Sequence, residues 1–124
     1  MHINKFWISS TSTSQVKTIA QRTGLTPNLV CRMAMLLSFE TGPISGTPDE
    51  VIKGQEFNAY TLFGDLQPLF IDLLRYVEFG NSQKEVNDSE LLERLGRHVD
   101  RGARLLIVRL KSPKDAAELL SSSV

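Results

Sequence analysis

The most constraining feature of the sequence is the segment TGLTP at residues 23–27, which separates two helices. Gly24 suits the position just after a helix C-terminus, where a left-handed backbone costs glycine nothing. Thr26 supplies an N-cap side chain, and Pro27 fits the first helical position because its missing N–H would have no partner there. The segment therefore predicts one helix over residues 14–23 and a second over residues 27–40.

The second predicted helix is apolar on almost every side. Between Leu29 and Phe39 only Arg32 and Ser38 are polar. Such a helix must be covered on more than one side. Two interpretations stay open: a second copy of the chain supplies part of the cover, or the helix lies at the centre of its own chain. A chain of 124 residues forms only a modest core, so we prefer self-association.

A short strand is predicted before the first helix, over residues 3–9. Aromatic and β-branched residues alternate there, which places Phe6 and Ile8 on one side and Lys5 and Trp7 on the other. The serine and threonine run at residues 9–14 then supplies turn and N-cap chemistry. The chain therefore opens with strand, helix, tight turn and helix.

The remaining chain predicts mostly helices with polar connectors. The expected segments are a loop over 42–54, a short strand or irregular segment over 57–63, a helix over 65–79, a connector over 80–87, a helix over 89–101 capped by Asp88 or Ser89 and ended or kinked at Gly102, a segment of undecided type over 103–110, a last helix from Ser112 to about residue 120, and a frayed tail. The fold class is mainly α. We expect one compact helical domain over residues 1–124, with residues 1–41 as its strand–helix–helix part and 42–124 as its helical remainder.

Charge is distributed unevenly along the chain. The formal net charge is zero, but residues 1–41 carry +3, residues 42–93 carry −7 and residues 94–124 carry +4. A neutral total therefore does not exclude nucleic acid, because two basic ends permit a local basic face. The alternative is that the segments only pair with one another.

Several classes of protein are disfavoured. A single cysteine, Cys31, cannot form an internal disulfide or a multi-cysteine zinc site, and it fits a reducing compartment. We find no signal-peptide pattern at the N-terminus and no apolar run long enough to cross a bilayer. The expectation is a cytoplasmic protein with no membrane association.

Catalytic motifs are also missing, so we expect a protein that is not an enzyme and has neither a metal site nor a cofactor. The two imidazoles, His2 and His98, belong to no recognisable cluster, and His98 is predicted to be a surface or capping residue. Cys31 follows the start of the second helix and could act as a nucleophile or a sulfur carrier. Its neighbours are mostly apolar, so a buried structural role is the preferred interpretation.

The N-terminal order fits a ribbon–helix–helix module. In such modules two chains pair their N-terminal strands and insert them into the major groove, where alternate strand residues contact bases. The N–H groups at the start of the second helix can bind a phosphate. The alternative is an ordinary helical hairpin behind an edge strand. The residues that would contact DNA are Lys5 and Trp7 on the strand, Lys17 and Arg22 on the first helix, and Thr26 and Asn28 at the turn.

Four arginines form a second candidate surface. Arg94, Arg97, Arg101 and Arg104 share one stripe if the helix continues through Gly102. The stripe could follow a phosphate backbone. However, Glu90 and Glu93 precede Arg94 and Arg97 by four residues, which favours ion pairs within the helix. Contact with DNA, with a partner or with these acids stays open, with a slight preference for ion pairs.

Three stretches resemble a known family. The run RTGLTPNLVCRMAMLLSFE at residues 22–40 is similar to the signature of the DndE family. Further on, FNAYTLFGD at 57–65 and HVDRGARLL at 98–106 resemble two other stretches of that family. The resemblance implies a part in DNA phosphorothioation, in which sulfur replaces a non-bridging phosphate oxygen.

The family resemblance also implies a non-enzymatic, ribbon–helix–helix-like protein that forms oligomers, tetramers among its relatives. It implies binding to duplex DNA, nicked duplex above all, through surface lysines. The predicted function is therefore a DNA-binding accessory subunit that works with other sulfur-modification proteins. The alternative is a protein–protein adaptor with little DNA contact. The candidate DNA-binding residues are Lys5, Lys17, Arg22, Thr26, Asn28, Arg32 and Lys53.

Overall fold

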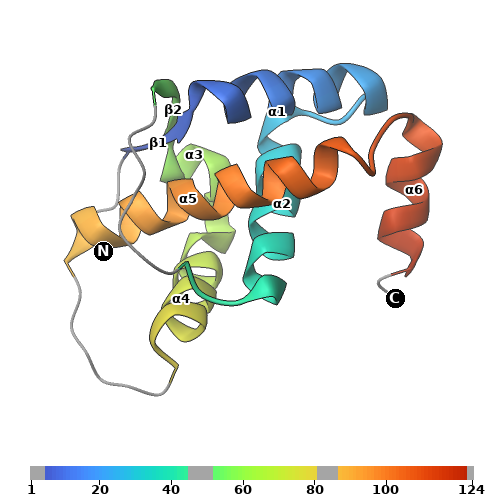
Figure 1. Cartoon of the computed structure of the whole chain (residues 1–124). Helices are drawn as coiled ribbons and strands as arrows, with labels where there is room; N and C mark the ends of the chain where they lie inside the picture. The colour runs from blue at the N-terminus through green and yellow to red at the C-terminus, as the bar shows by residue number, and fades with distance from the viewer. Residues whose placement is uncertain (1–4, 45–51, 81–86, 123–124) are drawn as a thin grey trace.

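The computed structural model describes residues 5–44, 52–80 and 87–122, and within them helices predominate (Figure 1). The mainly α fold class is therefore confirmed. The elements are β1 (Lys5–Ser9), α1 (Ser10–Thr23), α2 (Pro27–Thr41), β2 (Lys53–Asn58), α3 (Ala59–Phe63), the 3-10 turn η1 (Gly64–Leu66), α4 (Gln67–Phe79), α5 (Asp88–Ile107) and α6 (Pro113–Ser122).

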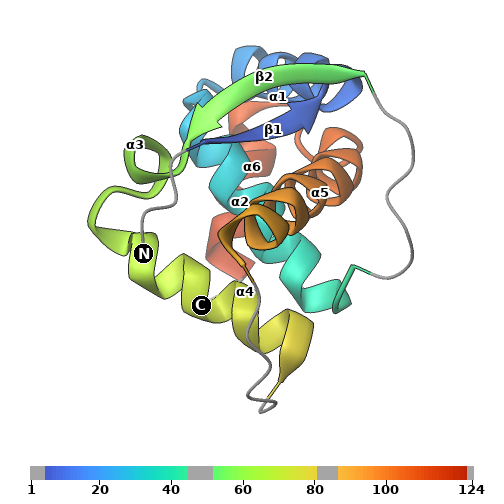
Figure 2. The same ribbon diagram turned by 90° about the vertical axis from the view of Figure 1, so that its left-hand side faces the viewer.

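The N-terminal strand forms with the predicted orientation of its side chains. Phe6 and Ile8 are buried, whereas Lys5 and Trp7 are exposed. Its partner is β2 of the same chain, which lies beside it in Figure 2 and pairs antiparallel with it. This pairing places Phe57 opposite Phe6. The two-stranded ribbon is thus completed within one chain, without the second copy that a two-chain ribbon requires.

The strand β2 corrects two predictions. Residues 53 and 54 were expected to lie in a loop, and residues 57–63 in a strand or irregular segment. Instead β2 ends at Asn58, whose side-chain oxygen accepts the N–H of Thr61 at 3.0 Å as α3 begins. The polar sequence KGQEFN has little strand pattern of its own, so pairing with β1 decides its conformation. Residues 45–51 of the predicted loop lie outside the described residues.

Helix α1 begins at Ser10 and not at residue 14. The Ser9 side chain accepts the N–H of Ser12 at 3.0 Å, and the Thr13 hydroxyl donates to the Ser9 carbonyl at 2.9 Å. The serine and threonine run is therefore the first turn of the helix, because the cap forms at its first member. At the other end Gly24 is left-handed, with φ of 79°, as predicted.

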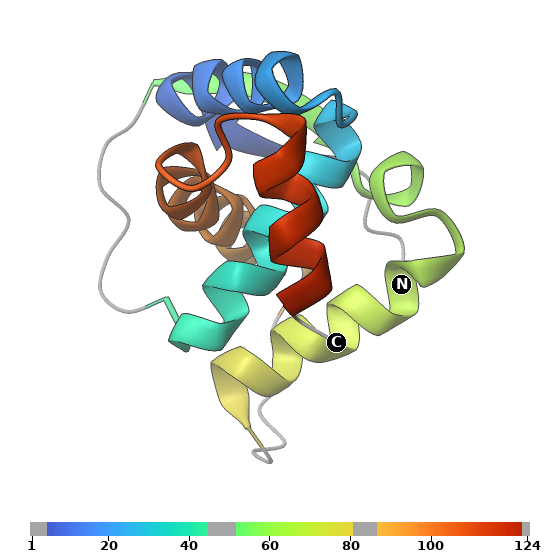
Figure 3. The ribbon, with the colours of Figure 1, turned by 90° about the vertical axis from the view of Figure 1, so that its right-hand side faces the viewer.

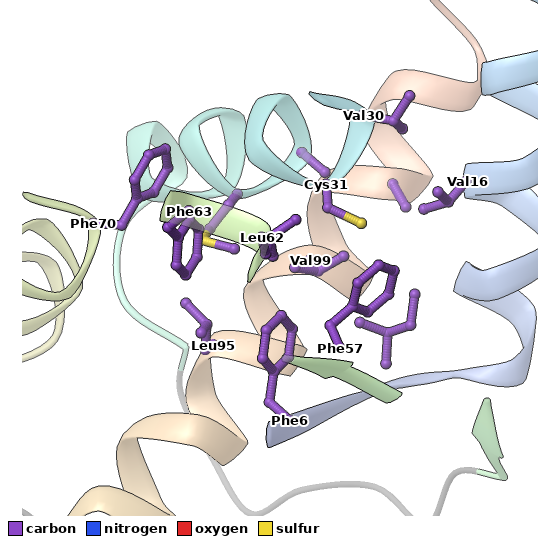
Figure 4. Packing of buried hydrophobic residues seen from close by; sticks show 14 of the residues in the cluster. Phe6, Val16, Val30, Cys31, Phe57, Leu62, Phe63, Phe70, Leu95 and Val99 are labelled. Carbon is purple, nitrogen blue, oxygen red and sulfur yellow. The ribbon is translucent and has the colours of Figure 1, made fainter. Parts of the chain in front are cut away.

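Helix α2 starts as predicted, with the Thr26 hydroxyl accepting the N–H of Leu29 at 3.2 Å. Its own chain buries most of its sides, including Cys31 and Met35, although Leu29 and Leu36 stay 42% exposed. Figure 4 shows Cys31 among the side chains of the core. The chain therefore supplies most of the cover that was expected partly from a second copy.

Helix α5 corrects the prediction at Gly102. The helix continues from Asp88 through Gly102 to Ile107, so the undecided segment is mostly helical. Gly102 is needed for contact, since a Cβ there would lie 2.6 Å from Ala34 Cα and overlap the Ala34 carbonyl. The cap is Asn87, not Asp88 or Ser89, because its side chain accepts the N–H of Glu90 at 2.8 Å.

The β1–β2 ribbon and α6 lie on opposite sides of the molecule (Figures 2 and 3). Figures 2 and 3, taken from opposite sides, show the β1–β2 ribbon on one side and α6 on the other, with α5 between them. The predicted helix over residues 65–79 forms as η1 followed by α4, and the last helix forms as α6. Among the described residues no helix combines the length and apolarity that a bilayer span requires.

Candidate nucleic-acid interface

A groove of about 750 Å³ lies between β1 and α5. The two elements approach closely because position 96 is glycine. A Cβ on Gly96 would overlap the carbonyl oxygen of Trp7 and lie 3.4 Å from its carbon. The side chain of Asp100 also joins them, since its Oδ1 accepts the Ser9 N–H at 2.9 Å. The groove is therefore a built feature of the fold.

The ribbon supplies two lysines and an aromatic ring to this groove. Lys5 and Trp7 come from β1, and Lys53 from β2. The Lys53 ammonium lies 5.4 Å from the centroid of the Trp7 ring, and the Lys5 ammonium lies 3.5 Å from a carboxylate oxygen of Glu56. Trp7 is 44% exposed. This wall is therefore basic and carries an accessible aromatic surface.

Helix α5 supplies three arginines to the opposite wall: Arg97, Arg101 and Arg104. Arg101 is immobilised, because its guanidinium donates to the Ser38 carbonyl at 2.7 Å and to the Gly42 carbonyl. Burial lowers the pKa of Arg101; Glu78 opposes this, and repulsion from Arg104 and Arg97 adds to it. Arg97 and Arg104 therefore each repel Arg101 along this wall.

The four arginines lie on one stripe, because α5 continues through Gly102. Three of them line the groove, whereas Arg94 does not. Arg94 donates to Glu78 and, at 3.1 Å, to Glu90, so it faces a buried cluster and not the groove. Arg97 lies 3.5 Å from Glu93. Both predicted ion pairs within the helix are therefore confirmed, while Arg104 lines the groove with no ion pair described.

The structure brings together two of the seven predicted DNA-binding residues, Lys5 and Lys53, in the groove lining. The other five lie elsewhere. Lys17 and Arg22 are exposed on α1, and Thr26 caps α2. Asn28 is half-buried, and Arg32 donates its Nε–H to the Leu62 carbonyl at 2.7 Å. The spacing of the groove arginines, four and three residues apart, was a signal in the sequence that they share one face of a helix. Nothing in the sequence indicated that this face lies opposite the ribbon.

The prediction for His98 is wrong, since its side chain is fully buried. The Ser38 hydroxyl lies 2.7 Å from His98 Nδ1, and His98 Nε2 lies 3.0 Å from Glu78 Oε2. His98 follows Leu91 by seven residues and Leu95 by three, so the apolar stripe of α5 contains it. That spacing was the signal of burial.

The buried cluster has the order serine, histidine, carboxylate, but it offers no accessible nucleophile. Ser38 is fully buried, and its oxygen accepts from Arg101 Nε at 2.8 Å. Burial lowers the pKa of His98 more than Glu78 raises it. Burial alone would raise the pKa of Glu78, but hydrogen bonds from Ile44 N–H, Arg94 and His98 lower it overall. A neutral imidazole beside a carboxylate follows, which ties α2, α4 and α5 together.

Cys31 is buried among apolar side chains, as preferred from the sequence. Burial raises the pKa of its thiol to about 12. A thiolate is the nucleophilic form of cysteine. In this conformation Cys31 therefore lacks both the access and the ionisation that a sulfur carrier requires. Within the described parts of the chain, no group of three side chains suited to a metal ion occurs.

Comparison with known proteins assigns the chain. The model of the family "DNA sulphur modification protein DndE" matches residues 5–114. The crystal structure of DndE from Escherichia coli B7A, involved in DNA phosphorothioation modification, aligns with a TM-score of 0.70 and 21% identity, covering 86% of this chain and 98% of that one. The crystal structure of a DndE variant with glycine-to-lysine substitutions, involved in DNA phosphorothioation, aligns with a TM-score of 0.62 and 19% identity. The alignment covers 83% of this chain and 95% of that one. No curated protein matched. Because the family model spans most of the sequence, the chain belongs to the DndE family of DNA sulphur modification proteins.

Proposed function

We propose that the protein is a non-catalytic DNA-binding accessory subunit of the phosphorothioation machinery. It binds duplex DNA, intact or nicked, in the cytoplasm as a homo-oligomer, while other sulfur-modification proteins perform the chemistry. The observation that supports this proposal is the groove in which Lys5, Lys53 and the α5 arginines meet. These cations come from three segments far apart in the sequence, and their shared location is suited to a polyanion.

The balance of charge in the groove favours phosphate binding. Lys5, Lys53, Arg97, Arg101 and Arg104 line it, against two acids. Asp100 accepts the backbone N–H of Ser9, and Glu93 pairs with Arg97. Each phosphate contact releases counterions. A plot of the logarithm of the binding constant against the logarithm of the salt concentration therefore has a slope of about −0.9 per contact.

Fluorescence anisotropy with a labelled duplex of roughly 20 base pairs tests this proposal, at about 50 and about 200 mM KCl. Arg104→Gln and Lys53→Gln should each weaken binding several-fold and reduce the salt slope by about 1. Lys114→Gln is the matched control, because Lys114 lies on α6, 3.9 Å from Glu118, away from the groove. Undetectable binding of the unaltered protein at the lower salt would rule the proposal out.

The second candidate function is an adaptor that assembles the sulfur-modification proteins with little DNA contact. The exposed apolar side chains of Leu66, Leu69 and Tyr76 beside and along α4 favour it, since Leu69 is 53% and Tyr76 65% exposed. Such a face is typical of a protein contact. A pull-down with the partner proteins should then lose them in a Leu69→Ser, Tyr76→Ser variant, whereas Lys53→Gln should retain them. The opposite pattern favours the DNA-binding role.

Assembly is tested separately by the solution mass. A homo-oligomer should give a mass that is a multiple of the 13.9 kDa chain, and nicked duplex should shift it further. A monomer at all concentrations contradicts the oligomer proposal and leaves DNA binding to be judged by the titration above.

A further inference from the structure

The exposed indole of Trp7 is unusual beside so many cations. Trp7 lines the groove and is 44% exposed. The ammonium of Lys53 lies over its ring, and Lys5 precedes it by two residues on the same face. An indole offers a flat apolar surface on which a planar ligand can stack. A flat ring framed by cations is complementary to a base attached to phosphates.

We infer that the groove between β1 and α5 binds an unpaired stretch of DNA, with one base stacked on Trp7 and the neighbouring phosphates on Arg97 and Arg104. The inference rests on the proposed DNA binding and adds an unpaired stretch to the duplex DNA proposed above. Proteins that bind single strands combine a positively charged groove with aromatic side chains on which bases stack.

The size of the groove is suited to an unstacked nucleotide. Its volume of about 750 Å³ lies in the range of sites that hold small molecules, so a base and its phosphate fit between the ribbon and α5. In an intact duplex both faces of each base are covered by its neighbours. Stacking on Trp7 therefore requires a base that has left the stack.

The arginines of α5 supply binding partners for the phosphates of a strand in the same groove. Arg101 is held by carbonyl oxygens of Ser38 and Gly42, so it forms a fixed wall. Arg104 is exposed one turn further along α5, and Arg97 one turn before. A phosphate bound at Arg97 or Arg104 would offset the repulsion that each exerts on Arg101. Glu93 competes for Arg97, so binding should depend strongly on salt.

Trp7 is also the single tryptophan of the chain, so its fluorescence reports on the groove directly. We would titrate the protein at low salt with an oligothymidylate of about 12 nucleotides, within the 4–16 typical of single-strand sites, and with a stable blunt duplex compared at equal phosphate concentration. The oligothymidylate should quench Trp7 at concentrations several-fold below those of the duplex. Equal or weaker quenching by the single strand overturns the inference.

Substitutions at Trp7 separate stacking from charge, with anisotropy of labelled DNA as the readout. Trp7→Leu should weaken oligothymidylate binding by about tenfold and leave duplex binding within about twofold, whereas Trp7→Phe should retain most of the single-strand affinity. Circular dichroism checks that the variants fold. Unchanged single-strand binding by Trp7→Leu overturns the inference while duplex binding stands. Failure of both DNAs to bind the unaltered protein rejects the proposed function, and the inference with it.

Discussion

Replacing Gly102 by alanine should destabilise the protein by about 2 kcal/mol, although alanine is the better helix former. Gly102 lies in the interior of α5, where this helix crosses α2. A Cβ there would lie 2.6 Å from Ala34 Cα and closer still to its carbonyl, against an ordinary contact of at least 3.4 Å. The obstacle is backbone, so no rotamer change relieves it.

The magnitude follows from two opposing effects. The helices must separate by roughly 1 Å or more, which loosens a close-packed interface that includes the buried Cys31 and Val99. Overpacking of this kind costs up to about 3 kcal/mol. Removing glycine from a helix interior returns about 1 kcal/mol. The net loss of about 2 kcal/mol should lower the urea midpoint by about 1 M.

Urea unfolding followed by circular dichroism measures this loss. Gly24→Ala is a useful comparison, because Gly24 has φ of 79° with nothing within 4 Å, so its cost is conformational and about 1 kcal/mol. Adding Ala34→Gly to the Gly102→Ala variant should not restore stability, since the overlap is with the Ala34 backbone. A Gly102→Ala midpoint equal to or above that of the unaltered protein would refute the reasoning.

Three further predictions follow from single contacts. Burial holds the pKa of His98 below its ordinary value of 6.5, so the unfolded chain takes up the proton first, and the free energy of unfolding should fall as the pH drops below 6.5; a His98→Gln variant measured by urea unfolding should show a smaller fall. Cys31, with a pKa of about 12, should resist Ellman's reagent at neutral pH and react after denaturation; Cys31→Ser should leave cellular phosphorothioation unchanged, and loss of modification would restore the sulfur-carrier hypothesis. Asn87→Ala should lower thermal stability by about 1 kcal/mol, and Ser89→Ala by much less, because Asn87 caps α5; equal effects would contradict the cap.

Local signals in the sequence predicted those features of the fold that local contacts decide. Gly24, Thr26 and Pro27 mark the break between α1 and α2 within the residues where it occurs. The alternation around Phe6 predicted the buried side of β1. Caps and alternation act within a few residues, so one chain segment contains the whole signal.

The errors arose where partners distant in sequence decide the outcome. Gly102 looked like a helix end, but it serves the crossing of α5 with Ala34, which is 68 positions away in the chain. The polar segment of β2 forms a strand because β1 pairs with it. His98 was expected at the surface, yet Ser38 and Glu78 satisfy it in the core.

The mainly α class, the TGLTP boundary and the family could be predicted from the sequence, because each rests on short contiguous runs of residues. The groove, in contrast, exists only in the folded chain. The tertiary structure aligned Lys5 and Lys53 with Arg104, and it turned Arg94 away towards Glu78. The physical reason is that an electrostatic site depends on distances between side chains. Those distances follow from strand pairing and helix crossing, which bring together residues that no window of sequence contains.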